Sequence, residues 1–500
     1  MRLGVKHQNQ QSVIRADFSG GLNTAASIEG IAENQLSQVI NMELDHSTGR
    51  LKTCAGTVDV FTHEISAVMY DGINKRLLLA DNQRRVYVAD LTEGTVSGSI
   101  GTLTGTLYPS TDSWEDGLLI ATGGKLQYYN GTALVTIDTS PNARSVYIRA
   151  GRVVITDNEN VRYSGVGDET NWSEDTGDPS ASVFVEAGYK DGGHFVGMAS
   201  LSEACLLIKD NRRVYRLTGE FPEWQITEIS RNVDCLGRMA FCSVADAVFI
   251  LGKNTVAVLQ VTDNYRDSPP QNVATLITSE IQKLPANALV RYVPPLSQVW
   301  FVGADGGVLI YDLAGQAWYA RKFNSPVVDV FAVGEKVYVA KADRLSRLED
   351  TTFYDAGKPL MWRFRAQRLV SKHDYLLKRT EVSIIPFTAN LYSGHVYCGA
   401  VMLGLPMSIR AVKIYHNRSP IWKNRIKIHG AGRTKGVYAA GERIYKNMEM
   451  IYGSKIPIFS RRTISKFSTN VFRSKFLDMG GYGTMGGFVL NHILIDIAEV

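Results

Sequence analysis

The stretch RLLLADNQRRVYVAD, residues 76–90, consists of two short apolar segments joined by a polar turn at Asp81-Asn82. Val, Leu and Tyr favour β-strands, and Asp and Asn accept the backbone conformations that two-residue hairpin loops require. The stretch therefore predicts a β-hairpin with a tight turn. The same pattern recurs six more times along the chain, at residues 118–131, 152–165, 205–219, 248–261, 299–312 and 337–350.

The hairpins recur at a spacing that is typical of a β-propeller. The apolar residue after each turn marks its position, and the mean separation of these markers is about 43 residues, the length of one four-stranded blade. We therefore predict an all-β fold: a six- or seven-bladed β-propeller with an N-terminal segment and a basic, mainly β C-terminal domain. A β-sandwich, or a string of small β domains, explains the recurrence less well. The markers are Val86, Leu126, Val161, Val214, Val256, Val308 and Leu345.

The composition is that of a globular protein. The chain has 500 residues, of which 45% are hydrophobic, so wholesale disorder is excluded. Its five cysteines are scattered and form no Cys-x-x-Cys pair, which argues against a disulfide framework and against a zinc knuckle. The first 20 residues lack the apolar core of a signal peptide, and no apolar run reaches the length of a transmembrane helix. We expect a protein that folds in a reducing compartment and has no membrane span.

The near-neutral net charge of +5 conceals two oppositely charged parts. Residues 361–500 carry 22 basic and 7 acidic side chains, a net charge of +15, whereas residues 1–360 have a net charge of −10. Three readings remain open: contact with DNA phosphates, contact between subunits, or solvated surface charge. The candidate DNA-channel or interface residues are Arg425, Lys427, Arg433, Lys435, Arg461, Arg462, Lys466, Arg473 and Lys475.

The two ends of the chain lack the hairpin pattern. Apolar residues at helical spacing predict a short amphipathic helix around residues 32–42. The apolar run FVLNHILIDIAEV, residues 488–500, predicts a buried strand. We therefore divide the chain into an N-terminal segment with a short helix at 1–59, a β-propeller at 60–358 and a basic C-terminal domain at 359–500.

The N-terminal segment resembles the opening of a family of bacteriophage proteins. The layout begins with FSGGLN, residues 18–23, continues with a helix that ends near Asn41, and closes with two glycines. It is similar to tail nozzle proteins of short-tailed phages, also described as tail-tubular B or packaged-DNA stabilisation proteins. The stretch from Tyr163 to Trp172 resembles a blade of the same proteins. The motif residues are Phe18, Gly20, Gly21, Leu22, Asn23, Asn41, Gly49 and Gly56.

The resemblance implies a structural virion protein. Such proteins form a hexameric ring below the portal and the tail adaptor, extend the channel for genomic double-stranded DNA, and hold packaged DNA until ejection. They also carry fibres or spikes. The resemblance thus implies assembly in the cytoplasm of a host bacterium, a final location in the virion tail, an N-terminal segment that contacts the ring or the adaptor, and a C-terminal platform domain.

The charge of residues 361–500 also bears on this family's channel. Six copies would place a charge of about +90 in one ring, and a lumen that held all of it would retain DNA by phosphate attraction. We therefore favour contact with neighbouring subunits or the adaptor over DNA contact, and place both ahead of solvated charge.

The competing class is a propeller enzyme or lectin that degrades or binds glycans. A glycosidase needs two carboxylates across a cleft, whereas adjacent pairs such as Glu115-Asp116 lie in predicted turns. Asp191-Gly192-Gly193-His194 is also typical of a turn. The sequence has no P-loop, no Gly-x-Ser-x-Gly and no dinucleotide-binding fingerprint. We expect no catalytic residues, no cofactor and no bound metal.

Overall fold

The computed structural model describes residues 10–175, 178, 180–202, 204–219, 224–260, 269–303, 305–386, 393–399, 401–404, 421–423, 426–429, 444–446, 449–452, 464–468, 472–484 and 486–499. The chain divides into two compact units. One unit, the propeller unit, spans Thr57–Leu348. The other, the terminal unit, combines Met1–Gly56 with Glu349–Val500. The three consecutive segments expected from the sequence are thus grouped differently, because both ends of the chain contribute strands to the same sheets.

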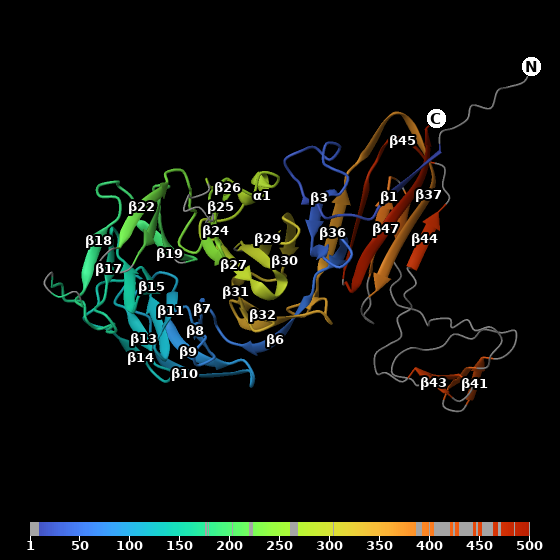
Figure 1. Ribbon diagram of the computed structural model, residues 1–500. Coiled ribbons are helices and arrows are strands. Elements are labelled where there is room, and N and C mark those ends of the chain that lie inside the picture. Colours follow the sequence, from blue (N-terminus) through green and yellow to red (C-terminus); the bar gives the residue numbers. More distant parts are fainter. Residues whose placement is uncertain are drawn as a thin grey trace, which may run out of the picture. The chain divides into compact units, whose positions relative to one another are not determined.

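The propeller unit is built from four-stranded sheets that follow one another along the chain (Figure 1). Seven such sheets lie between residues 56 and 349 in the part of the chain that the structure describes. They are β7 (Ala67–Asp71), β8 (Arg76–Ala80), β9 (Arg85–Asp90) and β10 (Thr95–Thr102); β11 (Ser110–Trp114), β12 (Gly117–Ala121), β13 (Gln127–Tyr129) and β14 (Leu134–Thr136); β15 (Ser145–Arg149), β16 (Arg152–Thr156), β17 (Asn160–Tyr163) and β18 (Val183–Glu186); β19 (Phe195–Leu201), β20 (Ala204–Lys209), β21 (Val214–Thr218) and β22 (Gln225–Ser230); β23 (Phe241–Val244), β24 (Ala247–Leu251), β25 (Val256–Gln260) and β26 (Gln271–Asn272); β27 (Leu289–Val293), β28 (Gln298–Val302), β29 (Gly307–Asp312) and β30 (Ala317–Lys322); and β31 (Val327–Val333), β32 (Lys336–Lys341), β33 (Arg344–Glu349) and β6 (Gly56–Thr62).

The predicted hairpins are confirmed, and each forms the two central strands of its sheet, as β8 and β9 do. All seven marker residues are buried, because central strands are covered on both faces by neighbouring sheets. The turns differ from the prediction. The β8–β9 connection contains four residues rather than two, and the buried Asp81 carboxylate closes it by accepting bonds from the backbone N–H groups of Gln83 and Arg85.

The seventh sheet closes the ring with a strand from the N-terminal side. The first strand of each sheet contacts the first strand of the next in the series β11, β15, β19, β23, β27 and β31, and β31 contacts β7. The outermost strand of the last sheet is β6, which pairs with β33. Apolar clusters fill the space between successive sheets, as where Leu78 and Val86 pack with Leu118 and Ile120. A propeller therefore hides its strand edges by repetition around an axis.

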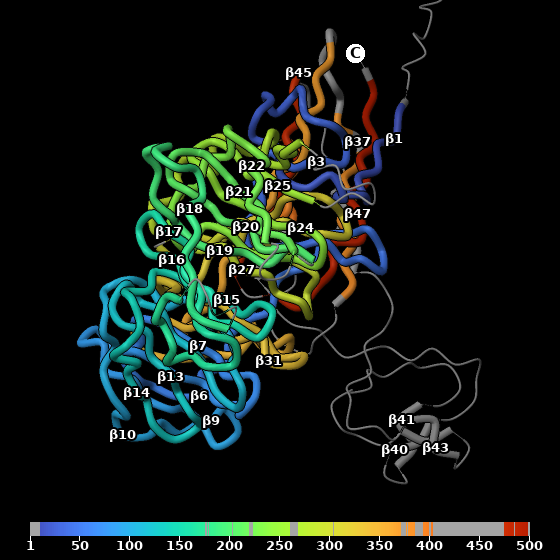
Figure 2. Tube along the Cα trace, turned by 60° about the vertical axis from the view of Figure 1, so that its left-hand side comes forward, coloured from blue at the N-terminus to red at the C-terminus, as the bar shows by residue number. Residues whose placement is uncertain are grey.

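The terminal unit contains a seven-stranded and a six-stranded sheet among its described residues (Figure 2). The larger sheet has the order β4-β5-β47-β37-β44, with β1 on β47 and β45 on β37, and the smaller has the order β2-β3-β36-β46-β38-β39. Trp362 from the smaller sheet packs edge-on against Phe488 from the larger, with ring centroids 5.2 Å apart. The strands are β1 (Gln10–Arg15), β2 (Gly21–Leu22), β3 (Gln35–Ile40), β4 (Met42–Asp45), β5 (Arg50–Thr53), β36 (Met361–Ala366), β37 (Leu369–Pro386), β38 (Ser393–Cys398), β39 (Val401–Gly404), β44 (Ile464–Ser468), β45 (Phe472–Leu477), β46 (Met479–Thr484) and β47 (Phe488–Glu499).

The remaining described elements are short. The strand β34 (Tyr354–Asp355) pairs with β35 (Lys358–Pro359), and a four-stranded sheet contains β40 (Ile421–Lys423), β41 (Ile426–His429), β42 (Ile444–Lys446) and β43 (Glu449–Tyr452). The helices are α1 (Thr278–Ile281) and the 3-10 turn η1 (Pro294–Leu296).

The helix predicted around residues 32–42 is wrong, whereas the strand predicted at 488–500 is confirmed as β47. Residues Gln35–Ile40 form β3, which pairs with β36. A register shift between Leu36 and Gln38 places an extra residue in β3, so Leu36 and Val39 are both buried although they are three positions apart. A spacing of three between buried residues is typical of a helix, and here a single β-bulge produces it.

Candidate functional site

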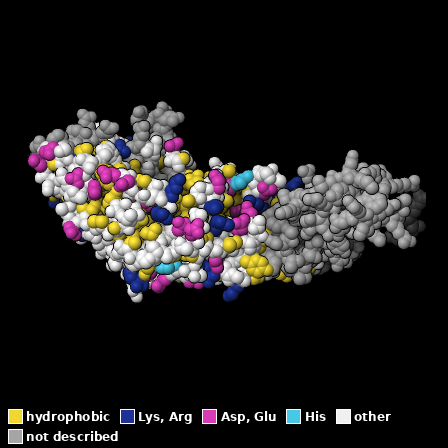
Figure 3. All heavy atoms as spheres, turned by 90° about the horizontal axis from the view of Figure 1, so that it is seen from below, with side chains coloured by type: hydrophobic (Ala, Val, Ile, Leu, Met, Phe, Trp, Pro, Cys, Tyr) yellow, Lys and Arg dark blue, Asp and Glu magenta, His cyan; other side chains and the backbone are white. Residues whose placement is uncertain are grey.

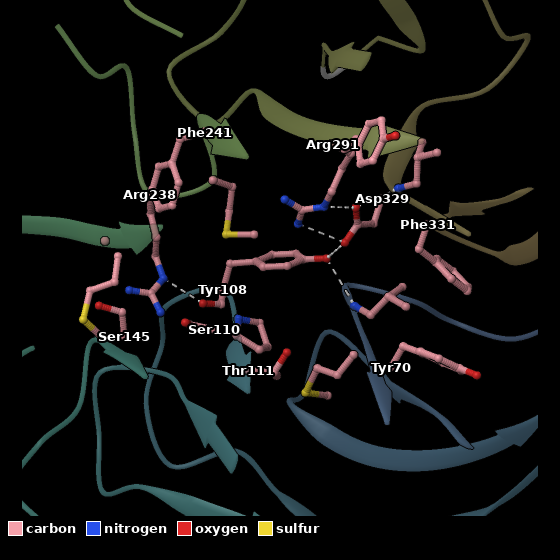
Figure 4. A pocket seen from close by; sticks show the side chains of 18 of the residues that line it. Tyr70, Tyr108, Ser110, Thr111, Ser145, Arg238, Phe241, Arg291, Asp329 and Phe331 are labelled. Carbon is pink, nitrogen blue, oxygen red and sulfur yellow. Dashed lines mark hydrogen bonds and ion pairs between the residues drawn. The ribbon is translucent and has the colours of Figure 1, made fainter. Parts of the chain in front are cut away.

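The innermost strands of all seven sheets line one cavity in the propeller unit (Figure 4). Its volume is about 450 Å³, and it is open to solvent. Backbone geometry explains the placement, because the first strand of every blade lies nearest the axis. We call this space the axial cavity. Its walls include Tyr70, Tyr108, Ser110, Thr111, Ser145, Met198, Arg238, Met239, Phe241, Arg291, Asp329 and Phe331.

A hydrogen-bonded triad with a buried carboxylate at its centre occupies one side of the axial cavity (Figure 4). Arg291 donates from Nε and Nη2 to the two carboxylate oxygens of Asp329, at 2.8 and 3.2 Å. The Tyr108 hydroxyl donates to the same carboxylate at 2.5 Å and accepts a bond from the Val68 amide at 3.2 Å. Burial and the negative charge of Asp329 raise the pKa of Tyr108 well above its usual value, so the phenol stays neutral. Burial alone would lower the pKa of Arg291, but Asp329 and Tyr108 raise it.

Arg238 lies across the axial cavity from Asp329 and has a different environment (Figure 4). Its Nε donates to the Tyr108 carbonyl at 2.8 Å and its Nη2 to the Ala121 carbonyl at 3.2 Å. Its Nη1 is buried and has no hydrogen-bond partner among the described residues. Burial, and then the positive charge of Arg144, lower the pKa of Arg238 to about 10. The side chain therefore stays charged near neutral pH, held by two neutral carbonyls.

Sequence reasoning missed these residues, although a signal was present. Arg291 and Asp329 are single charges inside apolar strands, in LVRYV and VVDVFAV. A charge at such a position needs a partner when it is buried. The partner could not be read from the sequence, because the two residues are 38 positions apart and belong to different sheets.

The family-motif residues lie in the terminal unit, and each meets a local structural need. The Phe18 ring is fully buried and packs edge-on against Phe364. A Cβ at Gly20 would lie 2.7 Å from the Asn34 side chain. Gly21 has a φ of +61° where β2 begins, and Leu22 is buried beside it.

The polar motif residues hold the chain around β3 and β36. Asn23 accepts a bond from the Ala25 amide at 3.0 Å and donates to Gln35 at 2.8 Å. Asn41 has a φ of +53° and donates from Nδ2 to the Met361 carbonyl at 2.7 Å.

The last two motif glycines serve backbone needs. Gly49 has a φ of +69° in the turn between β4 and β5. A Cβ at Gly56 would lie 2.6 Å from the Tyr354 carbonyl oxygen. The motif therefore specifies the terminal fold and contributes no chemical group to the axial cavity.

Most predicted basic residues cannot be placed. Arg425, Arg433, Lys435, Arg461 and Arg462 lie outside the described residues. The backbone places Lys427 in β41, Lys466 in β44, and Arg473 and Lys475 in β45. The Lys475 side chain is exposed.

Some basic residues near the start of this region are already paired. Arg368 donates to Asp478 at 2.7 Å and to Glu29 at 2.7 Å, and Arg365 donates to Asp478 at 3.2 Å. The charge difference persists when the chain is divided at the observed boundaries. The terminal unit has a net charge of +13 and the propeller unit one of −8. On the face drawn in Figure 3, basic and acidic side chains lie next to one another over the described part.

The described residues offer few other reactive groups. They contain no group of three or more His, Cys, Asp or Glu side chains that could hold a metal ion. Their helices are too short and too polar to cross a membrane. The five cysteines are free thiols, and Asp191, expected in a turn, forms a buried ion pair with Lys209 at 2.9 Å.

Comparisons with known proteins found similar solved structures but no similar sequence. No protein-family model and no curated protein sequence matches the chain. Among solved structures, BamB from Moraxella catarrhalis is similar over 62% of this chain and 92% of its own, with 12% identity and a TM-score of 0.38. The Pan2 WD40 domain of Neurospora crassa is similar over 59% of this chain and 96% of its own, with 9% identity and a TM-score of 0.41. The resemblance to tail nozzle proteins stays a prediction.

Proposed function

We propose that this chain is a structural protein of a bacteriophage tail, of the nozzle type, which assembles into a hexameric ring around the DNA channel. The N-terminal motif carries this proposal. Its residues hold strands of the terminal unit, whose two larger sheets combine strands from both ends of the chain, with the propeller lying between those ends in the sequence. We therefore expect the motif to maintain the terminal unit, and we assign to that unit the contacts with the rest of the tail.

The charge distribution supports the same role. A closed ring uses heterologous interfaces, in which two different surfaces of the subunit meet. The units carry net charges of +13 and −8, and this opposite sign would steer association between unlike parts of neighbouring subunits.

An exposed sheet face in the terminal unit supports subunit contact. Met361, Met402 and Tyr482 expose 64%, 55% and 38% of their surface on β36, β39 and β46 of the smaller sheet. Arg363 is exposed on the same face and is paired with Tyr482 in the register. Met, Tyr and Arg are enriched in protein interfaces, and gathered exposed apolar groups mark them. We propose that this face contacts a neighbouring subunit.

The mass of the purified protein tests the assembly. Native mass spectrometry over a range of concentrations should give a six-fold multiple of 55.2 kDa, alone or with the adaptor. Tyr482→Glu should reduce the hexamer, because it places a charge in the contact. Tyr354→Glu, at a side chain of similar exposure outside that face, should leave it intact. A strict monomer under all conditions, or turnover of a polysaccharide by that monomer, would overturn the proposal.

The basic residues require a separate test in phage particles. Reversing Arg461, Arg462 and Lys466 to Glu should block incorporation into tails if they contact neighbours. Normal incorporation with premature loss of DNA would indicate a role in the channel instead. Reversing the exposed Lys75, Lys253 and Lys336 of the propeller is the control for the change in total charge. Normal assembly and normal retention in both variants would leave the solvated-charge reading in place.

A further inference from the structure

The charge that lines the axial cavity is compensated on one side only. Arg291 and Asp329 neutralise each other, and Tyr108 satisfies the carboxylate further. Arg238 has two carbonyl partners and no carboxylate among its described contacts. A half-buried guanidinium without a counter-ion is unfavourable, because the partial loss of its hydration is not offset by an opposite charge. The cavity therefore carries an uncompensated positive charge at Arg238.

The other walls of the axial cavity are a mixture of apolar and hydroxyl groups. Phe241 lies beside Arg238, and Phe331 lies on the side of Asp329 (Figure 4). Met198 and Met239 add flexible apolar surface, whereas Ser110 and Thr111 add hydroxyls. A space of about 450 Å³ whose walls mix apolar side chains with convergent polar groups has the size of a small-ligand site.

We propose that the axial cavity binds a carboxylate attached to an apolar or aromatic group, with the guanidinium of Arg238 as its anchor. Arginine and carboxylate form charge-assisted hydrogen bonds, and Arg238 lines the cavity with no acidic partner among its described contacts. The apolar body would pack against Phe241 and the methionines. This activity goes beyond the structural role proposed above and does not depend on it.

The chemistry favours a carboxylate over other anions. A phosphate dianion would call for a second cation on the cavity wall, and the other arginine that lines the cavity, Arg291, is already paired with Asp329. A neutral apolar ligand would fill the space but leave the charge of Arg238 without a counter-ion. The carboxylate could belong to a free small acid or to the end of a polypeptide, since both present the same group.

Calorimetry on the full chain tests the proposal with 4-bromobenzoate as the probe and neutral 4-bromobenzamide as the control. The acid should bind saturably with one site per chain, and roughly tenfold or more tightly than the amide, the effect of one charge-assisted hydrogen bond. Equal binding of acid and amide, or no saturable binding of the acid, would overturn it.

Substitutions of Arg238 test whether its guanidinium binds the carboxylate. Arg238→Gln should weaken the acid roughly tenfold and leave the amide unchanged, whereas Arg238→Lys should retain part of the preference for the acid. Arg76→Gln removes an exposed positive charge from the same unit and should change neither. Unchanged acid binding by a folded Arg238→Gln protein would overturn the assignment.

A crystallographic measurement avoids any variant that fails to fold. The anomalous signal of bromine in the wild-type protein with 4-bromobenzoate should appear between the inner strands, with the carboxylate directed at Arg238. Bromine found only outside the axial cavity would overturn the proposal.

Two further probes distinguish the sources of the carboxylate. Acetyl-Gly-Gly-Phe with a free C-terminal carboxylate should bind more tightly than 4-bromobenzoate if the natural ligand is a polypeptide end. It should bind more weakly if the cavity suits a free small acid. The peptide amide should bind less than the peptide acid in the first case, and equal binding of the two would contradict a role for the terminal carboxylate.

Discussion

Asp59 and Arg344 are 285 positions apart in the chain, and their side chains meet at 2.7 Å. Asp59 lies on β6 and Arg344 on β33, so the pair joins the strand that enters the propeller to the strand that completes it. Ser346 donates a second bond to Asp59 at 2.8 Å. These contacts fix the register of the closing strand.

A charge swap tests this closure. Asp59→Arg should lower the stability of the propeller by about 1 kcal/mol, because partly exposed pairs contribute little and repulsion replaces attraction. Adding Arg344→Asp should recover only part of the loss, because it also breaks the pair of Arg344 with Asp343, and the bond from Ser346 would not return. Arg76→Asp, which breaks a pair within one sheet, controls for a local charge change. Thermal unfolding is the measurement, and a double variant less stable than both single variants would contradict the pairing.

We expect acid to lower the free energy of unfolding of the propeller by protonating Asp191. Burial would raise its pKa, but hydrogen bonds from Gly193, Lys209 and Tyr215 lower it from 3.8 to about 2. Because the pKa of Asp191 is lower in the folded than in the unfolded protein, the ionised carboxylate stabilises the fold at any pH above the unfolded-state pKa. This stabilisation is lost as the pH falls from about 4 towards 2. It amounts to roughly 2 kcal/mol for this buried carboxylate.

Urea unfolding at pH 7 and pH 2.5 measures the effect. Asp191→Asn should destabilise the protein by about 3 kcal/mol at pH 7, because it leaves Lys209 buried without its counter-ion. The difference from wild type should shrink at pH 2.5. Asp246→Asn, in an exposed turn, is the control. A difference for Asp191→Asn that does not depend on pH would contradict the assignment.

Gly56 should tolerate no side chain. An added Cβ would lie 2.6 Å from the carbonyl oxygen of Tyr354, and backbone atoms cannot move aside as a flexible side chain can. Gly56→Ala should therefore destabilise the terminal unit by about 3 kcal/mol in calorimetry. Gly30→Ala, whose nearest contact is 3.4 Å from Ser27, should change stability by about 0.5 kcal/mol or less. Equal effects of the two substitutions would contradict the close approach.

Asn41 adopts a left-handed backbone conformation and also donates a side-chain hydrogen bond, and two substitutions separate these contributions to stability. Asn41→Gly keeps the left-handed backbone accessible but loses the bond to the Met361 carbonyl, at a cost of about 1 kcal/mol. Asn41→Ala loses the bond and also strains the backbone, which adds about 1 kcal/mol. Chemical denaturation should rank wild type above the glycine variant and that above the alanine variant. The reverse order of the two variants would show that the backbone conformation is not limiting.

The thiols should be unreactive in the native protein. Burial raises the pKa of Cys205, Cys235, Cys242 and Cys398 to about 12, so almost no thiolate forms at pH 8. A thiol reagent should label these residues slowly in buffer and all five cysteines rapidly in urea. Mass spectrometry of the labelled chain gives the count. Fast labelling of Cys205 without urea would contradict its burial.

The central hairpins were predictable because burial on both faces produces continuous apolar runs. In β12, β16 and β24 every residue is buried, so nothing in those runs conflicts with a strand. Outer strands are weaker signals, since β10 has no buried residue and β26 has only two residues, both exposed. β3 was mistaken for a helix because a bulge changed its period.

The axial cavity could not have been predicted from the sequence. Its residues come from seven sheets, and their convergence depends on the closed ring, which no local pattern encodes. For the nine basic candidate residues, the sequence indicated a location but no role. Charge density located a region, but composition does not distinguish contact with a neighbour, a nucleic acid or water.

The insertion of the propeller into the terminal unit has a consequence for synthesis. β3 pairs with β36, and β5 with β47, so strands made early must wait for partners more than 300 residues later. At 5 to 20 residues per second this delay is roughly 15 to 60 s. During that time the early strands have unpaired edges on the ribosome, and β6 likewise waits for its partner β33. Chaperone binding to nascent chains should therefore concentrate on residues 10–53.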